Sequence, residues 1–337
     1  MLRVNMEKLL DKIDDSIKKR GTGYEYDPSK LYLVLSRNES EKLLGEQFER
    51  AFDLSTEINS LVGQIHGDNI NKDEISLRLE VLNAEISTYT DKTVQQYLMQ
   101  WYLPVKALFL YRSGLVADAE RLTLESITII DGLICQGISS FLFRVVLQHS
   151  NMLTLYLKNE EYDRAFSLGS EVIDYLFNNK VGKSLHGESL NDTALWMEME
   201  FLRECNGYYY FKSIVDKLLK LKAKDFDSYS IYIKKISEPL TRMQISTEQR
   251  YHILQWIRAE SSLINGNTSD FYENCHNFFD EENGLPSEYL KAYFIDSMLF
   301  DIGKNSDVIN GPVYSGRLLN AKANLGKGVV ELATKSV

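Results

Sequence analysis

Two segments of the chain repeat one pattern of residues, and this repetition restricts the fold more than any other feature. In residues 107–121 an apolar helical stretch ends at a turn containing Gly114, and a second helical stretch contains Ala119. In residues 153–166 the corresponding positions hold Glu160 and Ala165. Alignment of the two alanines gives a step of 46 residues (165 − 119). A helical hairpin buries its apolar face by stacking on a copy of itself, so the pattern predicts a helical-repeat protein.

Other positions follow the same register. Ala107 and Leu153 are equivalent residues of the first helix of each hairpin. The two alanines of the second helix stand where the helices come closest, because a larger side chain would push them apart. A weaker third copy begins at Ala259 and has Gly266 at its turn. The N-terminal third of the chain shows helical periodicity without a repeat signature.

The chain is poor in residues that interrupt helices. Its 337 residues include only 5 prolines and 19 glycines, and no alternation of apolar and polar residues persists beyond a few positions. Apolar residues make up 44%, which is enough for a substantial core. We therefore predict an all-α fold, an α-solenoid of stacked antiparallel hairpins with about 11–13 helices.

The predicted organisation has four segments. They are an N-terminal helical segment (1–90), repeat-like hairpins (91–178), C-terminal hairpins (192–303) and a weakly patterned tail (304–337). The polar loop 178–191 is the candidate hinge or boundary between the two halves. Within the first segment, periodicity predicts a short helix near residues 29–35 and a long one from about 39 to 65, which Asn38 or Ser40 could cap.

Charge and composition restrict the partners and the compartment. The net charge of −10 repels phosphate backbones at long range and disfavours nucleic acid as a partner. Three widely spaced cysteines do not form a disulfide framework and suggest reduced thiols. No secretory signal is expected, and no run approaches the roughly 18 apolar residues of a membrane span. These features predict a cytoplasmic protein with no membrane partner.

Local sequence does not assemble a catalytic or metal-binding set. No phosphate-binding glycine loop, His-Glu-x-x-His pair or Cys-x-x-Cys pair is present. His66 and His186 fall in polar loops, where we expect solvated side chains, and the basic stretch 212–224 is expected to be a solvated helix face. We predict no catalytic residues, no metal ligands and no cofactor.

The two best copies resemble the tetratricopeptide-repeat family. The resemblance is carried by LeuTyrArgSerGlyLeuValAlaAspAla at 110–119 and TyrLeuLysAsnGluGluTyrAspArgAla at 156–165. The family repeats at about 34 residues, whereas this chain repeats at 46, as in degenerate arrays with longer helices. The resemblance implies helical hairpins whose first helices line an inner groove.

That groove is the candidate binding site. The resemblance places on it seven residues of the first helices: Trp101, Tyr111, Arg112, Thr154, Lys158, Trp256 and Glu260. Trp101 and Trp256 are also candidates for core positions, because large aromatic side chains are usually buried. The paired Lys and Asn residues with which some family members clamp a carboxylate are absent, so carboxylate capture is not expected. A mixed aromatic and aliphatic groove suits a helix or an extended apolar peptide.

The predicted function is therefore non-enzymatic binding of a protein or peptide, as a scaffold or adaptor. One alternative is a regulatory switch in which a small peptide changes the oligomeric state. Another is an all-α enzyme whose site assembles across distant helices. An apolar terminal hairpin without a capping helix would favour a homodimer.

Overall fold

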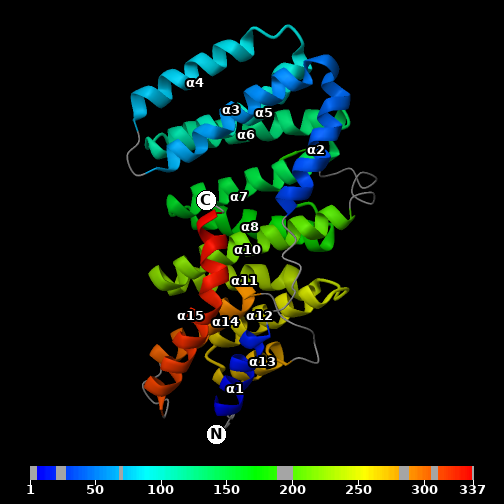
Figure 1. The fold of residues 1–337 in the computed structure, drawn as a ribbon. Helices are drawn as coiled ribbons and strands as arrows, with labels where there is room; N and C mark the ends of the chain where they lie inside the picture. Colours follow the sequence, from blue (N-terminus) through cyan, green and yellow to red (C-terminus); the bar gives the residue numbers. More distant parts are fainter. Residues whose placement is uncertain are drawn as a thin grey trace. The chain divides into compact units, whose positions relative to one another are not determined.

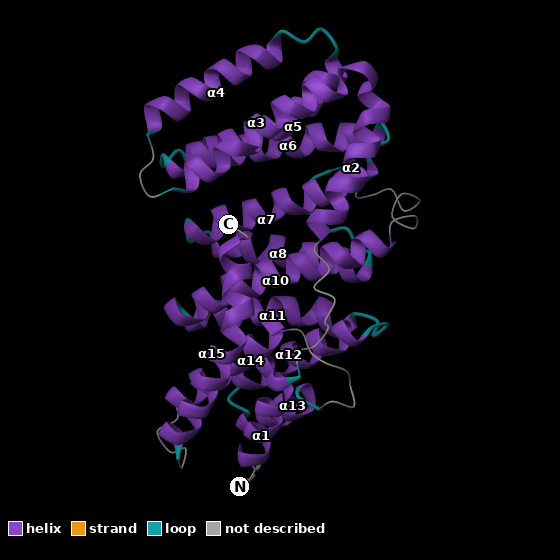
Figure 2. Cartoon of the chain, viewed as in Figure 1, coloured by secondary structure: helices purple, strands orange, loops and turns teal. Residues whose placement is uncertain are grey.

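The computed structural model describes residues 6–19, 28–67, 71–187, 200–280, 288–304 and 310–335, and every regular element among them is helical (Figure 2). The all-α prediction is confirmed. None of these helices combines the length and the apolar character that a membrane crossing requires. The α-helices are α1 (Met6–Lys18), α2 (Pro28–Leu44), α3 (Phe48–His66), α4 (Lys72–Ser87), α5 (Lys92–Arg112), α6 (Val116–Cys135), α7 (Leu142–Lys158), α8 (Tyr162–Asn178), α10 (Glu200–Lys224), α11 (Phe226–Arg242), α12 (Glu248–Ile264), α13 (Thr268–Phe278), α14 (Glu288–Lys304) and α15 (Gly311–Lys335).

The chain divides into two compact units, which we name by their place in the sequence. The central unit comprises residues 27–214, and the terminal unit comprises residues 1–26 and 215–337. The division falls inside α10 and not in the loop 178–191, where the sequence suggested a boundary. Part of that loop is held in place, because the amide and hydroxyl of Ser184 both donate hydrogen bonds to Glu171 on α8.

Successive hairpins build the central unit (Figure 1). Helix α5 packs against α3 and α6, α6 packs against α7, and α7 packs against α8. Ala119 and Ala165 are completely buried, as expected for residues that separate two closely packed helices. Glu39 on α2 accepts hydrogen bonds from the Ser139 hydroxyl and from the amide and hydroxyl of Ser140, in the short 3₁₀ helix before α7. This carboxylate satisfies a helix start that has no side-chain cap of its own.

The three predicted hairpin turns have the same backbone structure. Each first helix ends at a residue with left-handed backbone: Gly114 (φ 84°), Glu160 (φ 61°) and Gly266 (φ 71°). The next amide in each turn then donates a hydrogen bond to the carbonyl five residues earlier, which is the Schellman arrangement of helix ends. These bonds run from Leu115 to Leu110, from Glu161 to Tyr156 and from Asn267 to Ser262, and each is 2.9 Å long.

Two boundaries differ from the prediction. Helix α2 continues past Asn38 and Ser40 to Leu44, so neither residue caps the next helix. The break falls instead at Gly45, whose positive φ of 53° ends the helical path before α3. The weakly patterned tail contains α15, which packs against α14 and α1.

The terminal unit joins the two ends of the chain. Arg317 on α15 contacts three carboxylates of α1, at 3.0 Å for Glu7, 3.0 Å for Asp11 and 2.5 Å for Asp14. Lys12 on α1 also pairs with Asp280, just after α13, at 2.7 Å. Apolar residues of α1 complete this packing, since Leu9, Leu10 and Ile13 are buried. The N-terminal helix is therefore part of a unit built mainly from C-terminal helices.

Replacement of Glu160 by glycine should stabilise the protein. A side chain at positive φ carries a steric cost that glycine avoids. The free energy of unfolding of Glu160→Gly should therefore be about 1 kcal/mol higher than that of the matched variant Glu160→Ala. Urea titration of the two variants measures this difference. Gly114→Ala should destabilise the protein. An added methyl group at Gly114 meets no neighbouring atom, so the cost comes from the positive φ alone. Equal stability of the two Glu160 variants would contradict the turn assignment.

Candidate functional site

Two of the seven predicted groove residues lie in the core. Trp256 and Glu260 on α12 are each only 1% exposed, so the prediction that they face a partner is wrong. Both belong to the terminal unit, whereas the other five residues belong to the central unit. Trp256 is among the largest fully buried side chains of the protein. The alternative that a tryptophan at this position is a core anchor is the one that the structure favours.

Glu260 is the centre of a buried polar network. Its carboxylate accepts a hydrogen bond from the Lys222 ammonium group at 3.0 Å and another from the Tyr229 hydroxyl at 2.5 Å. Ser297 on α14 donates a third. Lys222 is 4% exposed, so the stretch 212–224 is not solvated throughout, as had been expected. A buried carboxylate with this set of donors holds α10, α11, α12 and α14 in a fixed arrangement.

The thiol beside this network is unreactive by its surroundings. Cys275 on α13 is completely buried. Burial, reinforced by the negative charges of Glu260 and Asp301, raises the pKa of Cys275 well above its usual range. A reactive cysteine needs the opposite environment, with exposure and nearby positive charge. Cys275 therefore packs as a small apolar side chain.

The remaining five predicted residues lie on α5 and α7 of the central unit, where two cation–aromatic contacts join the helices. The Arg144 guanidinium lies 4.2 Å from the centre of the Trp101 ring. The Lys158 ammonium group lies 4.9 Å from the centre of the Tyr111 ring. Both rings and Thr154 are half-buried, whereas Lys158 is exposed. The structure thus brings together predicted residues from two hairpins, as the proposed repeat requires.

Arg144 is a buried cation without an acidic partner among the described residues. Its guanidinium donates to the side-chain oxygen of Gln100 at 3.1 Å and to the Gln100 carbonyl at 3.0 Å, and only 7% of the residue is exposed. Burial lowers the pKa of Arg144. Nearby, the Gln100 side-chain amide has no hydrogen-bond acceptor among the described residues. This end of the α5–α7 face is rich in donors.

Three basic residues end three successive first helices. His66 closes α3, Arg112 closes α5 and Lys158 closes α7, at intervals of 46 residues (112 − 66 and 158 − 112). Burial lowers the pKa of His66, and the positive charges of Arg112 and Lys158 lower it further. We call these three residues the basic ladder. Sequence reasoning treated His66 as a solvated loop residue, although the repeat step extended backwards from Arg112 would have found it.

The second helices are joined by a different network. Arg164 on α8 pairs with Glu120 on α6 at 2.5 Å and also with Glu161 at 2.7 Å. The Tyr156 hydroxyl donates to Glu120 and accepts from Arg164, and the Arg164 guanidinium lies 4.1 Å from the centre of the Tyr156 ring. Arg164 thus links Glu120, Glu161 and Tyr156 in one network.

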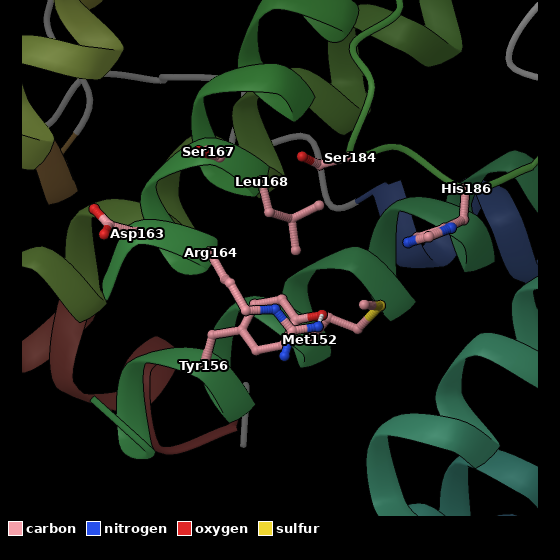
Figure 3. A pocket seen from close by; sticks show the side chains of 8 residues that line it. All are labelled: Met152, Tyr156, Asp163, Arg164, Ser167, Leu168, Ser184 and His186. Carbon is pink, nitrogen blue, oxygen red and sulfur yellow. Dashed lines mark hydrogen bonds between the residues drawn. The ribbon is translucent and has the colours of Figure 1, made fainter. Parts of the chain in front are cut away.

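A pocket of about 430 Å³ opens between α7, α8 and the loop that follows α8 (Figure 3). Its main polar groups are already engaged. Arg164 is paired with Glu120, and the Ser184 hydroxyl donates to Glu171 at 3.0 Å. The lining residues are Met152, Tyr156, Asp163, Arg164, Ser167, Leu168, Ser184 and His186.

His149 on α7 holds the loop that follows α8 by a hydrogen bond. Its Nδ1–H donates to the Val145 carbonyl at 2.8 Å, and its Nε2 accepts a hydrogen bond from the His186 amide at 3.2 Å. The two imidazole rings are stacked, with their centres 6.3 Å apart. Burial lowers the pKa of His149 to about 4, and the ring is therefore neutral at physiological pH. Its two hydrogen bonds need one N–H and one free nitrogen, which only the neutral ring provides.

Comparison with protein-family models, with curated proteins and with solved structures finds no match for this chain. The resemblance to tetratricopeptide repeats therefore rests on the quoted residues and stays a prediction. Across the described ranges, no three His, Cys, Asp or Glu side chains are grouped so that they could hold a metal ion.

The hydrogen bonds of His149 should make stability depend on pH. Above about pH 6.5 the residue is neutral in both the folded and the unfolded chain. Below that pH the unfolded chain takes up a proton that the folded chain resists until about pH 4. The free energy of unfolding should therefore decrease by about 3 kcal/mol as the pH falls from about 6.5 to about 4. His149→Gln should remove this contribution, as measured by urea titration at several pH values. Identical pH dependence of both proteins would contradict the assignment.

Removal of one partner of the buried network should be more harmful than removal of both. Lys222→Met leaves the Glu260 carboxylate buried without its cation and should cost about 3–5 kcal/mol. The double variant Lys222→Met/Glu260→Met should recover part of that loss, because no buried charge remains. Denaturant titration of Lys222→Met, Glu260→Met and the double variant measures the coupling. A double variant that loses the full sum of the single effects would show that the pair does not act as a unit.

Proposed function

We propose that the chain is a non-enzymatic protein- or peptide-binding module, and that its binding face is formed by the first helices α5 and α7 with the end of α3. The observation that carries this proposal is the pair of cation–aromatic contacts, Trp101 with Arg144 and Tyr111 with Lys158. Aromatic and arginine side chains are the residue types that dominate binding energy at protein interfaces. Here they line adjacent helices of neighbouring hairpins.

The proposal includes an α-solenoid arrangement of tetratricopeptide type. Three features support it: the repeated turn, the order of packing among α3, α5, α6, α7 and α8, and the spacing of the contacts between hairpins. Arg144 and Gln100 join two first helices, and Arg164 and Glu120 join two second helices, each pair 44 residues apart in sequence. Matching separations on both layers are expected when one hairpin stacks on the next in a constant register.

Two further parts of the proposal concern chemistry and location. Binding is favoured over catalysis because the polar groups of the pocket form structural hydrogen bonds. The free thiols of Cys135, Cys205 and Cys275 favour a reducing compartment such as the cytoplasm. No cofactor is proposed.

Loss of the two half-buried rings of the face, Trp101 and Tyr111, should weaken binding. Peptides selected from a random display library against the full chain should bind the variant Trp101→Ala/Tyr111→Ala at least about tenfold more weakly, because truncation of interface aromatics removes anchor contacts. Tyr162→Ala, which removes a half-buried ring from the second helix α8, is the matched control and should leave affinity unchanged. Circular dichroism confirms that each variant is folded. Failure to select any peptide, or equal losses in all variants, would overturn the proposed function.

A further inference from the structure

Helix α4 carries apolar residues on two opposite sides. It packs against α5 and α3, and its buried apolar residues are Ile75, Leu79, Leu82 and Ile86. The opposite side lies at the edge of the central unit (Figure 1), where Leu77 is 63% exposed and Val81 is 46% exposed. A helix that is apolar on all sides is expected to be covered on all sides. The fold covers one apolar side of α4 and leaves the other open to solvent.

The exposed apolar residues of α4 form a stripe along the helix. Leu77, Val81 and the exposed Ala84 stand at positions i, i+4 and i+7, which is the spacing of one helix face. Within the described ranges, no other two large exposed apolar residues lie one turn apart on one helix. Single apolar residues scattered over a surface are ordinary, whereas their gathering on one face favours a contact surface. We call Leu77, Val81 and Ala84 the outer stripe.

Carboxylates border the outer stripe on both edges. Successive residues of a helix are rotated by about 100°, so residues three or four positions from Leu77 and Val81 lie beside them. Four acidic residues fall on these edges, and we call them the acidic rim: Asp73 and Glu80 on one edge, and Glu74 and Glu85 on the other. None of the four forms a salt bridge with a residue that the structure describes. Arg78, the nearest cation on α4, is paired with Glu57 on α3.

The acidic rim selects among the possible occupants of the outer stripe. A second copy of the chain would pair this surface with itself, as in a two-fold dimer, and would bring the carboxylates of one α4 against those of the other. Like charges placed opposite each other disfavour such a contact. An anionic membrane surface would repel the rim for the same reason. The occupant that fits carries positive charge on both sides of its apolar residues.

We propose that the outer stripe of α4 docks an amphipathic helix of a partner protein, with apolar residues on the stripe and Lys or Arg side chains on the acidic rim. Helix α4 has 16 residues and is therefore about 24 Å long, which is enough to support about four turns of a partner helix. A contact of one helix with one helix is small, so binding should be reversible. This surface is separate from the face of α5 and α7, and the inference goes beyond the proposed function.

The test uses a labelled helical peptide as long as α4, with Leu along one face and Lys on both sides of the leucines. A second peptide has Glu in place of every Lys, and a third has the first composition in scrambled order. Fluorescence anisotropy with the full chain should show binding of the first peptide only, weakening as salt is added. Circular dichroism of each protein variant confirms that it is folded.

Loss of the apolar stripe should remove most of the affinity. The variant Leu77→Gln/Val81→Gln should bind the first peptide at least about tenfold more weakly, because it removes the apolar area that the peptide covers. The matched control is Leu33→Gln/Val34→Gln, which removes two side chains of α2 that are 55% and 61% exposed. These two residues are adjacent in sequence and do not share a helix face, so affinity should change less than about twofold.

Loss of charge from one edge of the rim should have a smaller effect. The variant Asp73→Asn/Glu80→Gln should bind roughly threefold more weakly, as expected for exposed ion pairs. The control variant Asp118→Asn/Glu125→Gln removes the same charge from the exposed side of α6 and should change affinity less than about twofold. Equal losses in a variant and its control would show that the peptide senses only the general acidity of the chain and would overturn the inference.

Further outcomes would also overturn it. These are equal binding of the Glu peptide or of the scrambled peptide, and no binding up to about 1 mM of the first peptide. A dimer in sedimentation that Leu77→Gln/Val81→Gln disrupts would make a second copy the occupant. The variant Trp101→Ala/Tyr111→Ala should bind the first peptide unchanged. If that variant alone loses the peptide, the α5–α7 face binds it, so the proposed function stands and this inference fails.

Discussion

The way in which the helices α5, α7 and α12 end is the constraint on which the repeated hairpin depends. A residue with left-handed backbone at 114, 160 and 266 terminates the helix, and a hydrogen bond across the turn closes it in the same way each time. The chain then reverses at a fixed point, so the second helix always packs back on the first from the same register. Where glycine fills the position the backbone is relaxed, and Glu160 shows that the geometry persists even with a side chain that opposes it.

A constant register explains why distant residues meet. Contacts between neighbouring hairpins join residues 44 apart, both on the first-helix layer through Arg144 and Gln100 and on the second-helix layer through Arg164 and Glu120. The same register aligns the ends of α3, α5 and α7 and so creates the basic ladder. None of these groups is unusual by itself. Their joint effect arises because a repeated backbone places chemically similar side chains side by side.

The two units use buried polar groups in different ways. In the terminal unit, Lys222 and Glu260 neutralise each other in a closed network in which the carboxylate receives three donors. In the central unit, Arg144 is buried against a ring and amide oxygens and has no carboxylate among the described residues. The first arrangement completes a core. The second leaves a buried cation whose charge no described carboxylate balances.

The sequence alone determined the helical class, the hairpins and the turns, because helical period, scarce proline and glycine, and capping signals act over a few residues. It identified Gly114 and Gly266 as turn residues, and each has that role. It also selected Tyr111 and Lys158, whose side chains are in contact. Only the tertiary structure decided that Trp256 and Glu260 are buried, that α1 joins α15, and that His66 lies beside Arg112 and Lys158. Burial and charge pairing depend on what packs against a helix face, and a helical period shows that a face is apolar without showing which element covers it.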